Sequence, residues 1–204
     1  MAINLTEIFG ALLSKDKTEN RPKLSPTLEN IVSVIYRMST EKSGPWIAGG
    51  CGRQLVLGEK TFNDIDVWFK DAFQFDQARE RLYDQFGYEM YETYTSENAT
   101  TYTVGQFKVQ LIRRAFYPNL DAVFKEFDFT CCQVAVNDDL TPYGPGVEDA
   151  KNYALKLNRF DPKAFLARYA KYVGYGYVMK PEEFIDIIDR KDLNYEFDGS
   201  VFGY

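Results

Sequence analysis

Hydrophobic residues first recur at helical spacing just after Ser25 and Pro26, which form a typical helix start with an N-cap hydroxyl and an early proline. The repeating residues are Leu28, Ile31, Ile35 and Met38. Similar patterns predict helices over residues 51–57, 74–85, 120–126, 161–173 and 181–189, and a short helix within residues 1–24.

Short apolar or alternating runs between these helices predict strands over residues 46–48, 64–69, 88–94, 100–104, 107–112 and 127–136. Glycine or polar turns join several of these runs as hairpins, so we expect a mixed sheet in an α/β (α+β) fold. The expected organisation is N-terminal helices in residues 1–44, a core in residues 45–157 and a small C-terminal helical segment in residues 158–204.

The absence of histidine restricts the possible chemistry of this chain of 204 residues. Histidine triads, histidine zinc sites and histidine general bases are all excluded. A metal would have to be held by oxygen ligands, which favour Mg²⁺ or Mn²⁺. The net charge of -6 argues against a strongly basic nucleic-acid-binding domain.

The cysteines and the apolar runs indicate a cytoplasmic protein. Cys51, Cys131 and Cys132 form an odd set with one adjacent pair, which is no disulfide framework. We expect the adjacent pair to pack within a strand. No apolar run approaches the length of about 20 residues that spans a bilayer, and the N-terminus lacks the pattern of a signal peptide.

Asp64 and Asp66 are the leading candidates for metal ligands. Residues two apart on a strand project from the same face, so the two carboxylates should lie close together. They would repel each other unless a cation lay between them, and divalent metals held there could bind a phosphate chain. The alternative, for an Asp-x-Asp pair alone, is a solvated strand end.

Gly49 and Gly50 follow the predicted strand 46–48 and allow a sharp turn into a short helix. The amides of the next residues would face outward at the helix N-terminus, where phosphate binds readily. Arg53 lies one turn further and could reach the same anion. The alternative is an ordinary tight turn, and two glycines alone are not evidence for a phosphate-binding site.

In combination, these motifs resemble the polymerase-beta-like nucleotidyltransferase superfamily, and most of all the head domain of tRNA CCA-adding and poly(A) polymerase enzymes. That family has Gly-Gly-x-Val-Arg-Asp-x-Leu-Leu-Gly and then Asp-x-Asp. This chain has Gly-Gly-Cys-Gly-Arg-Gln-Leu-Val-Leu-Gly over residues 49–58 and Asp-Ile-Asp over residues 64–66. A second family motif, Arg-Arg-Asp-Phe-Thr, is similar to Glu-Phe-Asp-Phe-Thr over residues 126–130.

The resemblance implies a Mg²⁺-dependent transfer from a nucleoside triphosphate, with departures that weaken it. Gln54 replaces the family's aspartate, and Gln110 stands where the wider superfamily has a third carboxylate. Asp128 could fill that third role or contact the ribose, as its family motif does. The alternative for Asp128 is a strand-edge residue that caps a turn.

Arg168 and Lys171 on the predicted helix 161–173 could bind the triphosphate by analogy with later helices of such enzymes. The alternative is a solvated basic face. The acceptor hydroxyl would belong to an RNA end or a protein side chain. A second hypothesis is a weakened or inactive relative that binds a nucleotide or a protein partner, as a regulatory or antitoxin-like subunit does.

Overall fold

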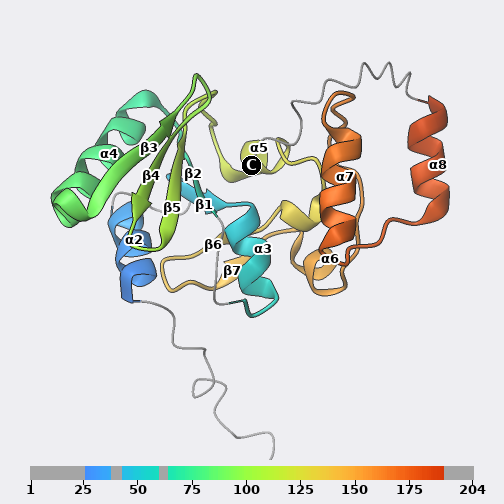
Figure 1. The fold of residues 1–204 in the computed structure, drawn as a ribbon, viewed down its shortest axis with the longest axis horizontal. Coiled ribbons are helices and arrows are strands. Elements are labelled where there is room, and N and C mark those ends of the chain that lie inside the picture. Colours follow the sequence, from blue (N-terminus) through green and yellow to red (C-terminus); the bar gives the residue numbers. More distant parts are fainter. Residues whose placement is uncertain (1–25, 38–42, 60–63, 191–204) are drawn as a thin grey trace, which may run out of the picture.

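A seven-stranded mixed sheet forms the centre of the computed structural model, which describes residues 26–37, 43–59 and 64–190 (Figure 1). The strands are β1 (Trp46–Ala48), β2 (Asp64–Trp68), β3 (Met90–Thr95), β4 (Ala99–Val104), β5 (Phe107–Ile112), β6 (Ala135–Val136) and β7 (Pro142–Tyr143). Their order is β3-β4-β5-β2-β1-β6-β7. Of these neighbouring pairs, β2 and β5 run parallel and the others antiparallel, which confirms the expected mixed sheet.

The helices flank this sheet in two groups. They are α2 (Pro26–Tyr36), α3 (Gly50–Val56), α4 (Ala72–Phe86), α5 (Leu120–Phe124), α6 (Val147–Lys151), α7 (Phe165–Gly174) and α8 (Pro181–Arg190). Figure 1 shows α2 and α4 beside β3 to β5, and α6, α7 and α8 at the opposite end. The helix expected within residues 1–24 and the cap Ser25 lie outside the described residues. No helix in the described ranges is both long and apolar enough to cross a membrane.

Alternate residues of β1 and β2 pack into two different cores, and this alternation orients the carboxylates. Ile65 and Val67 join the core that α2 and α4 cover, together with Leu28, Ile31, Phe75 and Leu82. Trp68 joins the opposite core, which lies under α5 and includes Val123 and Phe124. Asp64 and Asp66 share the strand parity of Trp68, so they face away from α2 and α4.

A third core joins the helices at the C-terminal end to the segment around Cys131 and Cys132. The prediction of one strand over residues 127–136 is wrong in its middle, because Thr130–Cys132 forms a 3₁₀ turn. Contacts from distant residues impose this turn: the Thr130 amide donates to the Lys156 carbonyl at 3.0 Å, and its hydroxyl to Asp149 at 2.6 Å. Both cysteines are buried, but in this turn rather than in a strand.

Helix α7 begins at Phe165, four residues later than the pattern of hydrophobic residues indicated. The Asp161 side chain accepts a hydrogen bond from the Lys163 amide at 3.0 Å, and the Asp161 carbonyl accepts one from the Phe165 amide at 2.8 Å. Residues 161–164 therefore form a capped turn that leads into the helix. A side chain that bonds to nearby backbone competes with helix formation.

Candidate functional site

Asp64 and Asp66 lie at the first and third positions of β2, on one face of the sheet and partly buried. Removal from water and the neighbouring Asp64 carboxylate raise the pKa of Asp66 from 3.8 to about 7, while the positive charge of Lys171 opposes the increase. Both effects disfavour the ionised form of Asp66. A cation held between the two carboxylates would stabilise that form.

Gly49 forms the turn from β1 into α3 and lies directly against Asp66. Its φ of 113° lies in a region that other residues rarely adopt. A Cβ atom there would lie 3.0 Å from Cε1 of Phe127 and 3.4 Å from Oδ2 of Asp66. The absence of a side chain at Gly49 therefore leaves the Asp66 carboxylate its space.

The two glycines after Gly49 have different surroundings. Gly50 faces open space, because a Cβ atom there would have no neighbouring atom within 4 Å. Gly52 packs so closely that a Cβ atom would lie 2.5 Å from the Val134 carbonyl oxygen. Val134 also accepts a hydrogen bond from the Gly49 amide at 2.9 Å. Close packing against Val134 therefore explains a glycine at residue 52, where the resembling family has valine.

Gln110 on β5 lies opposite Asp66 in the parallel register of β2 and β5, and Lys108 lies opposite Asp64. The amide thus occupies the neighbouring strand position at which the resemblance implies a third carboxylate. Across the described ranges, no group of three or more His, Cys, Asp or Glu side chains is placed to hold a metal ion. Within the described residues, the β2 pair is therefore not joined by a third carboxylate in such a group.

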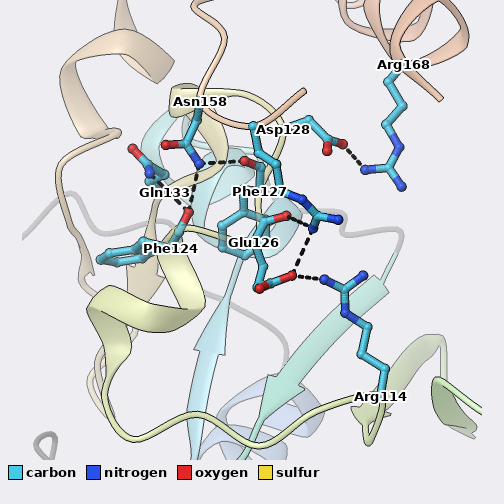
Figure 2. A network of polar contacts seen from close by, with 9 residues as sticks. Arg114, Phe124, Glu126, Phe127, Asp128, Gln133, Asn158 and Arg168 are labelled. Carbon is cyan, nitrogen blue, oxygen red and sulfur yellow. Dashed lines mark hydrogen bonds and ion pairs between the residues drawn. The ribbon is translucent and has the colours of Figure 1, made fainter. Parts of the chain in front are cut away.

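Asp128 and Arg168, two residues that the sequence suggested separately, form an ion pair with each other (Figure 2). Asp128 is 9% exposed, and its carbonyl accepts hydrogen bonds from the amides of Asn158 at 2.7 Å and Arg159 at 3.1 Å. Removal from water, together with the positive charge of Arg114, lowers the pKa of Arg168. Arg168 thus pairs with Asp128, while its side chain remains half exposed at 51%.

A second cluster beside this pair was not found in the sequence (Figure 2). The Glu126 carboxylate accepts a hydrogen bond from Arg159, with Nη1 2.9 Å from Oε2, and forms an ion pair with Arg114. Asn158 ties the cluster to the backbone, because its side-chain amide donates to the Phe127 carbonyl at 2.6 Å. The adjacent basic pair Arg113-Arg114, directly after the strand predicted over residues 107–112, is a sequence signal that could have indicated it.

Arg53 and Lys171 have opposite environments. Arg53 is only 6% exposed, and its guanidinium carbon lies 5.2–5.6 Å from the ring centres of Tyr172, Tyr175 and Tyr177. Lys171 is exposed on α7, and its positive charge offsets part of the increase in the pKa of Asp66. Of the expected phosphate-binding cations, Lys171 is thus the one that is exposed and whose charge also affects the pKa of Asp66.

Solved structures with the same overall fold include several CCA-adding enzymes. A CCA-adding enzyme in apo form II matches with a TM-score of 0.60 and 13% identity, over 82% of this chain and 46% of that chain. The Bacillus stearothermophilus enzyme in complex with CTP matches with a TM-score of 0.54, 14% identity and 81% and 44% coverage. The Thermotoga maritima enzyme complexed with tRNA_CCA matches with a TM-score of 0.55 and 16% identity, over 78% of this chain and 40% of that chain. At such identities the likeness shows the fold alone.

A relative with a clearer sequence match comes from a phage. The Gabija anti-defense 2 protein of Bacillus phage SPbetaL7 is 26% identical over 147 residues, which cover 70% of this chain and 36% of that protein. The chain thus matches little more than a third of the length of this relative. A model of the family described as "Gabija anti-defense 2 family protein" matches residues 22–142. Because that match covers more than half of the chain, the protein belongs to the Gabija anti-defense 2 family.

Proposed function

We propose that this chain transfers a nucleoside monophosphate from a nucleoside triphosphate to an acceptor hydroxyl, with Asp64 and Asp66 as the metal ligands. One observation carries the proposal: the two carboxylates share a face of β2, beside a turn in which Gly49 carries no side chain. The pKa of Asp66 rises to about 7 because burial and Asp64 disfavour its charged form. The similarity in fold to CCA-adding enzymes is consistent with this proposal.

The side chains around Asp66 fit a hard divalent cation such as Mg²⁺ or Mn²⁺. Two carboxylates provide oxygen ligands, and the side-chain oxygen of the neighbouring Gln110 provides a neutral one. When bound, the cation would neutralise charge on the phosphates. We assign the metal to Asp64 and Asp66, with Gln110 as a weaker neighbour.

The chain's own residues would orient the triphosphate. Gly49 and Gly50 allow its phosphates to approach the backbone closely, and Lys171 contributes an exposed positive charge. Arg168 adds a second charge, held in place by Asp128, whose other possible role is contact with the ribose.

The chemical step balances without a further reagent. The acceptor oxygen forms a bond to the α-phosphorus. The bond between that phosphorus and the oxygen that bridges the α- and β-phosphates breaks. Pyrophosphate leaves with the electron pair, and the hydroxyl proton passes to solvent. The amide of Gln110 cannot accept that proton, in contrast to a carboxylate.

The acceptor is either an RNA end or a protein side chain, and we favour a protein. The net charge of -6 disfavours long contacts with a nucleic-acid backbone. The phage relative carries the name Gabija anti-defense 2, so we propose a protein of the Gabija defence system, met in the cytoplasm, as the acceptor.

A second function follows from one observation, the amide of Gln110 beside Asp66. With two carboxylates instead of three, the site would bind a triphosphate but would transfer the nucleoside monophosphate slowly or not at all. The protein would then act by binding a nucleotide or a protein partner, as a regulatory or antitoxin-like subunit does.

The test is incubation with each of the four labelled triphosphates and Mg²⁺ or Mn²⁺, with Gabija proteins or with total RNA as acceptor. We expect label on a protein, located by mass spectrometry, and no label with Asp64→Asn plus Asp66→Asn. That double variant should fold and gain stability, because the repulsion between the carboxylates of Asp64 and Asp66 in the wild-type protein is removed. Label on RNA would change the acceptor class. Absence of label would overturn the transfer, and absence of calorimetric heat for every triphosphate would also overturn a nucleotide-binding role, which leaves only the binding of a protein partner.

A further inference from the structure

Arg53 is a buried cation without an acidic partner. It is 6% exposed, and none of the ion pairs in the described part of the chain includes it. Its Nε atom also lacks a hydrogen-bond partner among the described residues. A buried charge is costly unless other groups compensate for it, so the surroundings of Arg53 must supply that compensation.

Three tyrosine rings surround the guanidinium group. The distances from its central carbon to the ring centres are 5.6 Å for Tyr172, 5.2 Å for Tyr175 and 5.5 Å for Tyr177. Each lies within the range of a cation–π contact, and such contacts strengthen when they are removed from water. Burial alone would lower the pKa of Arg53, but a hydrogen bond with Tyr177 and the neighbouring phenols raise it overall, so the group stays charged.

All three rings come from the end of α7 and the three residues that follow it. Tyr172 is itself held in the third core: its hydroxyl lies 2.7 Å from Sγ of Cys132, and its ring contacts Phe129 edge to face at 5.1 Å. Tyr177 is 1% exposed. Arg53 therefore joins α3 to the C-terminal end of α7 through a fixed set of aromatic faces.

This joint lies between the two parts of the proposed triphosphate site. Helix α3 begins at the Gly49–Gly50 turn beside Asp66, and the Arg53 amide donates to the Gly49 carbonyl at 3.1 Å. On the other side, Lys171 directly precedes Tyr172 on the exposed part of α7. A shift of α7 along Arg53 would therefore move Lys171 relative to the β2 carboxylates.

We propose that Arg53 is a positioning residue: its guanidinium, enclosed by Tyr172, Tyr175 and Tyr177, fixes the end of α7 that carries Lys171 against α3, the helix that begins at the Gly49 turn beside Asp66. This inference rests on the proposed function. It assigns Arg53 no contact with phosphate, and it explains a buried arginine that has no carboxylate partner.

The test compares Arg53→Met, which removes the charge, with Arg53→Lys, which keeps it on a smaller group. Phe184→Leu is the matched control, because it reduces packing in the same core, where Phe184 contacts Tyr169 at 4.7 Å, without touching Arg53. We expect Arg53→Met to weaken triphosphate binding about tenfold, with a smaller effect on kcat, and Arg53→Lys to recover part of the loss. Phe184→Leu should change binding less than about threefold at a similar loss of thermal stability.

Hydrogen exchange of the amides in residues 165–177 separates this inference from the proposed function, because it needs no ligand. We expect faster exchange there in Arg53→Met than in Phe184→Leu. Wild-type protein that binds triphosphate while Arg53→Met binds equally well would overturn the inference and leave the function standing. Wild-type protein that binds no triphosphate would overturn the function, and equal exchange in the two variants would then overturn the docking role of Arg53 as well.

Discussion

Gln110 lies directly beside Asp66 in the parallel pairing of β5 with β2. The site therefore has an amide at the strand position from which a third carboxylate would reach the same metal. The amide provides oxygen without negative charge, so it lowers both the repulsion within the site and its attraction for a cation.

Gln110→Glu should restore the missing charge with almost no change in shape. We expect the variant to be less stable than wild type by about 1–2 kcal/mol without metal, because a third carboxylate joins the pair. With Mn²⁺ we expect a larger rise in Tm than wild type shows. The same substitution at the exposed Gln106, in the β4–β5 turn, is the control and should give neither effect. Equal Mn²⁺ responses in both variants would place the metal elsewhere.

Gly49→Ala and Gly50→Ala form a matched pair of neighbouring substitutions. Alanine at residue 49 must adopt a φ of 113° and place its Cβ 3.0 Å from the Phe127 ring. We expect a loss of about 2–4 kcal/mol in the free energy of unfolding, measured by urea denaturation. Alanine at residue 50 meets no atom within 4 Å and starts a helix, so we expect it to be neutral or slightly stabilising. Similar losses for both would refute the tight turn.

The pKa of Asp66 should make stability fall as pH rises. The folded protein keeps a proton on Asp66 up to about pH 7, whereas the unfolded chain releases it near 3.8. Between these values the unfolded state binds fewer protons, so the free energy of unfolding decreases with increasing pH, by about 1–3 kcal/mol for this group. Asp66→Asn should remove this part of the slope in urea titrations at pH 5 and pH 8.

Asp138→Asn serves as the control for that comparison, because it changes an exposed carboxylate outside the site. We expect it to leave the slope intact. Saturating Mn²⁺ should reverse the wild-type trend, because the cation competes with the proton on Asp66 and binds better at higher pH. A wild-type slope identical to that of Asp66→Asn would show that Asp66 titrates normally.

The ion pair of Asp128 with Arg168 should be worth more than an exposed pair. Arg168→Gln leaves a nearly buried carboxylate without its partner, and we expect a loss of about 1–2 kcal/mol after allowance for the exposure of the arginine. Addition of Asp128→Asn should recover part of it, giving a measurable coupling energy in a double-mutant cycle. Arg79→Gln breaks the exposed pair with Asp76 at 3.3 Å and should cost no more than about 0.5 kcal/mol. Zero coupling between residues 128 and 168 would contradict the pairing.

The sequence was sufficient for the parts of the site that depend on strand parity and local turns. Asp64 and Asp66 share one face because alternation along a strand is a property of the backbone. The turn at Gly49 and the amide at Gln110 were likewise visible in short motifs. The strand parity and the glycine turn need only neighbours within a few residues, whereas the position of Gln110 beside Asp66 came from the family resemblance and depends on the pairing of β2 with β5.

The sequence was insufficient where distant segments decide the structure. Arg168 pairs with Asp128 across 40 positions, and no local pattern links the two. The 3₁₀ turn at Thr130 depends on Asp149 and Lys156, so a run rich in β-forming residues did not become a strand. Arg53 matched a phosphate-binding motif in type, but its aromatic surroundings come from residues 172–177.

The strand order has a consequence for how the chain folds as it is synthesised. β1 pairs with β6, so one edge of β1 stays without hydrogen bonds until Val136 has been synthesised. In the same way, β2 pairs with the later strand β5. Contacts over such sequence separations slow folding, because a long loop has to close before they contribute. The outer edge of β1, next to the strand that carries the carboxylates, therefore remains open until residue 136 has left the ribosome. A nascent chain at that stage would depend on chaperones more than one built from local hairpins.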